Sequence, residues 1–180
     1  MEAVLFLFFL LFYSLLHYWF GDNDTTAEKD KKRFAEGLQL VKNKQYGEGL
    51  DYFERQIKIN EKSAVAWLYK GFCNLKLDNY YAAILDLTTS EMLDNSLPAC
   101  YFWKAQSLYH IQEFNQSFKE IDKAVWFYRS ENADTYRWRA LIRLQLNQKS
   151  QAFADLRKAE DLGDEKAAAM LRGYSYMGVS

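Results

Sequence analysis

The side chains that most often act as metal ligands or nucleophiles are few in this chain and far apart in its sequence. The 180 residues include two cysteines and two histidines, which are Cys73, Cys100, His17 and His110. Their spacing matches neither a C-x-x-C pair nor an H-E-x-x-H motif, and metal sites depend on such clustering. We therefore predict no metal site, no bound cofactor and no disulfide scaffold.

Catalysis by a Ser-His-Asp or Cys-His arrangement would have to be built on His110, the one histidine beyond the first 20 residues. The sequence contains no G-x-S-x-G motif, no glycine-rich phosphate loop and no H-x-E metal motif. Acidic pairs such as Glu160 with Asp161, or Glu120 with Asp122, could carry acid-base chemistry, but their helical context predicts solvated faces. We predict no catalytic residue and no enzymatic activity. The alternative is an enzyme that uses Glu or Asp carboxylates with raised pKa values, clustered in a concave groove of the protein.

The charges beyond the first 20 residues are balanced. None of the 23 Lys and Arg residues precedes Lys29, and Glu2 is the only acidic residue before Asp22. The remaining 23 basic side chains are therefore matched by 23 acidic ones. Because such a surface has no strong net field to attract phosphates, we expect neither a nucleic acid nor a small-molecule substrate.

The first 20 residues are almost entirely apolar. Ala3–Phe20 has no formal charge over 18 residues, which as a helix spans roughly 27 Å. A cleaved secretory signal normally has basic residues before a shorter apolar core and a small-x-small site after it, and both are missing here. We predict a transmembrane anchor over residues 1–20, closed by Tyr18 and Trp19 at the membrane interface, and a linker over residues 21–25.

Basic residues after this segment predict its orientation. Lys29, Lys31, Lys32 and Arg33 follow within about 15 residues, and such residues favour the cytoplasmic side. The prediction is a single-pass membrane protein with its carboxy-terminal domain in the cytoplasm. The alternative is an exported protein whose amino-terminal signal is cleaved.

A repeat of 34 or 35 residues covers most of the remaining chain. Four columns recur in register: Gly37, Gly71, Ala105 and Ala140; Tyr46, Tyr80 and Phe114; Gly49, Ala83, Ser117 and Ala152; Phe53, Leu87, Ile121 and Leu156. Polar turns divide each unit into two helices, at Asn43-Lys44, Asp78-Asn79, Gln112-Glu113 and Asn147-Gln148. We expect the two helices of the second unit to cross closely where Gly71 meets Ala83.

These columns resemble the tetratricopeptide repeat (TPR) family, whose units are pairs of antiparallel helices. The matching residues are Trp67, Gly71, Tyr80 and Ala83 in the second unit; Tyr101, Ala105, Phe114 and Ala124 in the third; and Tyr136, Ala140, Ala152 and Ala159 in the fourth. The first unit matches the pattern less well, because Arg33 replaces the leading aromatic residue and Gly49 replaces the first alanine. The family's closing proline is absent from all four units, which have Glu61, Asn95, Arg129 and Asp164 instead.

The resemblance implies an all-α, TPR-like α-solenoid of four helix-turn-helix repeats over residues 26–163. Thr25 and Glu28 have the spacing of a capping box, so the first repeat helix should begin near Thr26. After Gly163 the sequence favours a further helix over residues 164–174, and we assign residues 164–180 to a capping helix and tail.

The resemblance also implies a binding surface, because in this family the first helix of each repeat lines a concave groove. Transferring that register selects Phe34, Leu38, Leu68, Phe72, Phe102, Gln106, Tyr109, Arg137 and Leu141. Most are apolar or aromatic, which suits an extended peptide or an amphipathic helix of another protein. Groove forms that capture the terminal carboxylate of heat-shock chaperones use Lys and Asn where this chain has Phe34 and Leu38, which argues against that mode. Some of the nine could instead pack between repeats.

Together these features predict a membrane-anchored scaffold or adaptor that binds another protein in an apolar groove. Two alternatives remain from the sequence: an exported repeat protein, and a structural subunit of a membrane-associated complex whose groove a neighbour fills. Fold resemblance by itself does not decide between them.

Overall fold

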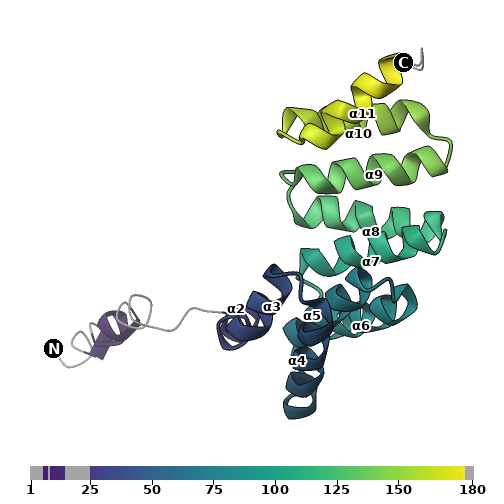
Figure 1. The fold of residues 1–180 in the computed structure, drawn as a ribbon. Coiled ribbons are helices and arrows are strands. Elements are labelled where there is room, and N and C mark those ends of the chain that lie inside the picture. Colours follow the sequence, from purple (N-terminus) through teal and green to yellow (C-terminus); the bar gives the residue numbers. More distant parts are fainter. Residues whose placement is uncertain (1–5, 8, 15–24, 177–180) are drawn as a thin grey trace.

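The computed structural model describes residues 6–7, 9–14 and 25–176, and within these ranges the chain is all-helical with no strand (Figure 1). From Thr26 onward the helices are α2 (Thr26–Arg33), α3 (Ala35–Lys42), α4 (Tyr46–Ile59), α5 (Ala64–Lys76), α6 (Tyr80–Leu93), α7 (Pro98–His110), α8 (Phe114–Phe127), α9 (Ala133–Gln145), α10 (Lys149–Asp161) and α11 (Glu165–Tyr176). Consecutive helices pack on one another, so that α5–α6, α7–α8 and α9–α10 form pairs stacked one after the next. The expected all-α solenoid is confirmed.

The first helix of the stack begins where the sequence predicts. The Thr25 side chain accepts a hydrogen bond from the backbone N–H of Glu28, and the Glu28 carboxylate accepts one from the backbone N–H of Thr25. This reciprocal capping box satisfies two of the backbone donors that a helix start leaves free. Phe34 separates α2 from α3, although its N–H and C=O both continue the helical hydrogen-bond pattern.

The turn inside each helix pair contains one residue in the left-handed backbone region. These residues are Lys44, Asp78, Gln112 and Asn147, with φ between 59° and 64°. The next residue closes each turn by donating its N–H to a carbonyl five residues earlier, as Glu113 does to Leu108 at 2.9 Å. This six-to-one bond is that of a Schellman motif, which satisfies the carbonyls at the end of the first helix. The predicted polar turns are therefore confirmed.

The close helix crossing expected at Gly71 is also confirmed. A Cβ atom at Gly71 would lie 2.7 Å from Cγ of Leu87 and 3.3 Å from the carbonyl oxygen of Ala83. Helix axes approach this closely only where one side chain is missing, which explains the small-residue column.

Four clusters of buried apolar residues run along the stack, each shared by neighbouring helices. Cys73 and Cys100 are fully buried within them as free thiols. Burial raises the pKa of each to about 12. Both residues therefore act as small apolar side chains in the core.

The predicted membrane anchor requires a correction. Most of residues 1–20, and the linker residues 21–24, lie outside the described residues. Within the described residues, no helix is long and apolar enough to cross a membrane. This finding contradicts the predicted single-pass membrane localisation, and the predicted cytoplasmic orientation depended on it.

Candidate protein-binding face

The first helices of successive pairs, α5, α7 and α9, carry a row of aromatic side chains that we call the inner face. Its rings belong to Tyr69, Phe72, Trp103, Tyr109 and Trp138. The ring centroids of Phe72 and Trp103 are 4.3 Å apart, and those of Tyr69 and Trp103 are 5.7 Å apart. Further along, Tyr109 and Trp138 form an edge-to-face pair at 5.6 Å. The rings therefore connect α5 to α7 and α7 to α9.

Each of the five rings is partly buried, so each also presents some surface to solvent. Aromatic pairs at these separations contribute about 0.5–1.5 kcal/mol beyond their area burial. Neighbouring rings already restrict one another's rotation. Binding of a ligand therefore costs little further side-chain conformational entropy. The inner face is thus an ordered apolar surface.

Positive charge accompanies this row at one edge. The Lys76 ammonium lies 5.2 Å from the centroid of the Phe72 ring, within cation–π range.

His110, the candidate base considered from the sequence, is exposed and stacks on Tyr80 with ring centroids 4.6 Å apart. Its imidazole also lies 6.1 Å from the Trp138 ring. These are packing contacts between aromatic rings.

Three of the nine residues predicted for the groove are buried in the core. Phe34 is 1% exposed and packs edge-to-face against Phe53, Leu68 is 2% exposed, and Gln106 is 7% exposed. They hold helices together and offer almost no surface to a partner. Of the other six, Phe72 and Tyr109 belong to the aromatic row, and Leu38, Phe102 and Leu141 are partly buried.

Arg137, the remaining predicted residue, is bound within the protein. Its Nε donates to Oδ2 of Asp164 at 2.7 Å, and its Nη2 contacts the Asp134 carboxylate. Burial alone would raise the pKa of Asp164, but hydrogen bonds from Arg137 and from α11 backbone N–H groups lower it below the ordinary value. The Arg137 guanidinium therefore links α9 to the start of α11.

Three inner-face residues were missed by the sequence reasoning. Tyr69, Trp103 and Trp138 each lie two positions before the small-residue column, at spacings of 34 and 35. The signal was therefore another column of the same repeat. Each is also the next residue after one that was selected, namely Leu68, Phe102 and Arg137.

A second missed column is a series of ion pairs inside the stack. In three helix pairs, a basic residue of the first helix contacts an acidic residue sixteen positions later in the second helix: Lys70 with Asp86 at 3.0 Å, Lys104 with Glu120 at 3.3 Å, and Arg139 with Asp155 at 2.7 Å. Each cation also reaches a carboxylate of the preceding pair, which is Glu54, Glu91 or Asp122. The prediction of a solvated face is thus wrong for Glu120, whose side chain is 15% exposed and lies inside this network. It holds for Asp122, Glu160 and Asp161, which are exposed, although Asp122 also contacts Arg139.

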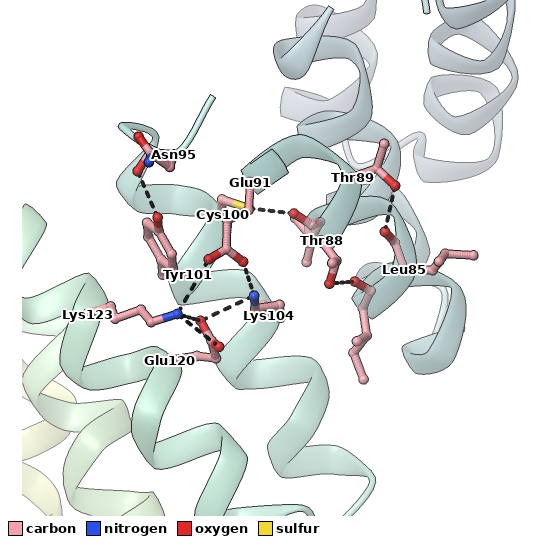
Figure 2. A network of polar contacts seen from close by, with 12 residues as sticks. Leu85, Thr88, Thr89, Glu91, Asn95, Cys100, Tyr101, Lys104, Glu120 and Lys123 are labelled. Atoms are coloured by element: carbon pink, nitrogen blue, oxygen red, sulfur yellow. Dashed lines mark hydrogen bonds and ion pairs between the residues drawn. The ribbon is translucent and has the colours of Figure 1, made fainter. Parts of the chain in front are cut away.

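The middle set of contacts is the most extensive (Figure 2). Glu91 and Glu120 both contact Lys104 and Lys123, and Lys104 is only 6% exposed. Burial alone would raise the pKa of Glu91, but the hydrogen bonds and charges of Lys104 and Lys123 lower it below its ordinary value. Burial raises the pKa of Asp86, and hydrogen bonds from Lys70 and Asn74 only partly offset this. The network fixes how the α5–α6 and α7–α8 pairs stack.

In the described part of the chain, no group of three or more His, Cys, Asp or Glu side chains is placed to hold a metal ion. The inner face presents aromatic rings and aliphatic groups. This arrangement suits recognition of an apolar surface.

Comparison with known proteins identifies the fold. No protein-family model and no curated protein sequence matches the chain. A crystal structure of MamA superposes with a TM-score of 0.69 and 15% identity, over 79% of this chain and 85% of that one. MamA from Desulfovibrio magneticus RS-1 gives 0.65 and 16%, over 72% of each chain. The first TPR domain of Spaghetti (RPAP3), bound to the HSP90 peptide SRMEEVD, gives 0.60 and 23%, over 65% of this chain and 94% of that one. At these identities the likeness shows the fold alone: this chain is a TPR-like α-solenoid.

Proposed function

We propose that the chain is a non-enzymatic scaffold that binds a segment of another protein on its inner face. The observation that carries this proposal is the row of partly exposed rings from Tyr69 to Trp138 across three helices. We further propose that residues 26–163 act as four repeats and residues 164–180 as their cap and tail.

The chemistry of the inner face favours an apolar or aromatic peptide. The first TPR domain of Spaghetti (RPAP3) binds the acidic peptide SRMEEVD. In this chain, the first-repeat positions where carboxylate-binding grooves have Lys and Asn are occupied by Leu38 and by Phe34, which is buried. Arg137, a cation on α9, is already neutralised by Asp134 and Asp164. Aromatic anchors that are held in place by neighbours are typical of binding hot spots.

A peptide-display selection on the immobilised full chain tests this proposal. Affinities of the enriched peptides are then measured by fluorescence anisotropy against Phe72→Ala and Trp138→Ala variants. We expect each variant to weaken binding by about tenfold or more, since hot-spot truncations cost at least 1–2 kcal/mol.

Trp126→Ala is the matched control, because Trp126 lies on α8 and is 72% exposed. Circular dichroism must show the same helix content in all three variants. If Trp126→Ala weakens binding as much as the inner-face variants, or if the inner-face variants bind normally, the proposed face is incorrect.

A further inference from the structure

The outward surface of α6 carries no formal charge. The only charged residues of this helix are Asp86 and Glu91, and both point into the stack. Asp86 is 2% exposed and accepts hydrogen bonds from Lys70 and Asn74 at 3.0 and 2.8 Å. Glu91 turns toward Lys104 (Figure 2). Every charge of α6 is therefore used internally.

Four outward residues of α6 form a continuous stripe, which we call the α6 seam: Tyr81, Leu85, Thr88 and Met92. Tyr81 is 77%, Leu85 67% and Met92 83% exposed. None of the three belongs to the core clusters of the described residues. Steps of four, three and four residues give the 3.5-residue period with which one helix packs along another.

The threonines of this region add methyl groups to the apolar surface. The Thr88 hydroxyl donates to the carbonyl of Ile84 at 2.7 Å, and the Thr89 hydroxyl to the carbonyl of Leu85 at 3.0 Å. Both hydrogen bonds are drawn in Figure 2. Because these hydroxyls already have partners within the helix, covering them leaves no polar group unsatisfied.

The other second helices of the stack differ in this respect. Their exposed residues include several charges: Glu48, Asp51, Glu54, Arg55 and Lys58 on α4; Lys119, Asp122 and Lys123 on α8; and Lys149, Arg157, Lys158 and Asp161 on α10. An exposed stripe of large apolar side chains without charge is characteristic of an interaction surface.

We propose that the α6 seam packs against the α6 seam of a second copy of this chain, antiparallel about a twofold axis. A surface that meets its own copy must not repel itself, and a charge-free seam meets that condition. An axis between Leu85 and Thr88 places Tyr81 beside Met92 of the partner subunit, a favourable sulfur–aromatic contact. It also places Leu85 against the methyl group of Thr88 of the partner subunit.

Sedimentation velocity of the full chain over a range of concentrations tests the pairing. The expected result is a reversible monomer–dimer equilibrium, with a dissociation constant that rises at least tenfold in Leu85→Glu. Ile59→Glu is the matched control, because Ile59 on α4 is equally exposed, at 67%, and lies off the seam. A monomer at every concentration, or a dimer that persists in Leu85→Glu, overturns the proposal.

Cysteine cross-linking tests the antiparallel arrangement independently. Tyr81→Cys and Met92→Cys variants are oxidised separately and as a mixture, and the native thiols stay out of the reaction because they are buried with a pKa of about 12. We expect disulfide-linked dimers in the mixture and few in either variant alone. Dimers in each variant alone indicate a parallel arrangement. No cross-linking in the mixture shows that another occupant, such as the amino-terminal segment, covers the seam. Either outcome overturns the proposal.

Discussion

Gly71 is the residue where the two helices of a pair leave no room for a side chain. Gly71→Ala places a methyl group 2.7 Å from Cγ of Leu87, and overpacking of this kind costs about 1–3 kcal/mol. Gly47→Ala is the control, because nothing lies within 4 Å of a Cβ atom there, and alanine within a helix stabilises by about 0.5–1 kcal/mol. Urea unfolding followed by circular dichroism should move the two midpoints in opposite directions. Equal shifts would contradict the crossing.

Gln112, in the turn between α7 and α8, is a position where a substitution should increase stability. Its φ of 64° is a conformation that glycine adopts without strain, so Gln112→Gly should stabilise the protein by up to about 1 kcal/mol. Glu113→Gly is the matched control, since the φ of Glu113 is −81°. Glycine there brings an entropic cost of about 0.5–1 kcal/mol and removes an exposed hydrogen bond from Gln116, so this variant should lose stability. Thermal unfolding measures both changes. A loss of stability in Gln112→Gly would rule out this explanation.

The sequence predicts residue positions well where one side chain must be small, and poorly where exposure depends on helix rotation. The Gly71–Ala83 crossing follows directly from the repeat columns. Successive residues on a helix are rotated by about 100°, so an assignment that is wrong by one position exchanges a buried residue for an exposed one. Leu68 was selected and is buried, whereas Tyr69 beside it is partly exposed.

Lys104 connects helices of two successive pairs. It lies in α7 between Glu91 of α6 and Glu120 of α8 and is 6% exposed. Lys104→Met leaves two carboxylates with Lys123 as their only remaining network cation, and breaking a buried ion pair costs about 3–5 kcal/mol. We expect the free energy of unfolding to fall by about 3 kcal/mol, because Lys123 retains part of the attraction. Lys119→Met, an exposed position on α8, should change stability by less than about 0.5 kcal/mol, and equal losses in chemical denaturation would contradict the network.

The same helices give stability a defined dependence on pH. The pKa of Glu91 is lowered below 4.5 in the folded state, so its stabilisation is present above that value and is lost as the pH falls through the folded pKa. Glu91→Gln should therefore flatten the loss of stability between about pH 5 and 3. The pKa of Asp86 is raised in the folded state, so protonation of Asp86 favours folding as the pH falls. Asp86→Asn removes this effect and should make the free energy of unfolding decrease more steeply at low pH. Urea unfolding at several pH values measures both slopes, and identical slopes in the two variants would refute the assignment.

Helix boundaries were predictable from polar turns and capping residues, but the ion pairs that join the helices were not. Lys70 and Asp86 are sixteen residues apart and meet only because the chain reverses at Asp78. On each helix taken alone, such residues have the pattern of a solvated face. Only the recurrence of the same spacing in three pairs distinguishes them.

At the scale of the whole molecule, each helix pair is stabilised mainly by its neighbours, as in any linear stack. The 34-residue period therefore predicted the solenoid, since one repeated unit determines the architecture. Hydropathy of residues 3–20 predicted a membrane span, but no helix of the described residues is long and apolar enough to be one. The α6 seam was not predicted, because the sequence of α6 does not show which of its apolar residues face the core and which face the surface.

The end of the stack provides the last prediction. Leu171 of α11 packs against the cluster that includes Phe153 and Ala159 of α10. Leu171→Asp places a charge in that contact and should detach α11, since an unpaired buried charge costs several kcal/mol. In a linear stack, loss of one helix destabilises the adjacent helix first. Hydrogen exchange should therefore accelerate throughout α11 and α10 and remain near wild type in α5 and α6. Arg172→Asp, on the exposed side of α11, should leave both regions protected. Uniform acceleration along the whole chain in Leu171→Asp would show that the stack unfolds as one cooperative unit and that α11 is more than a local cap.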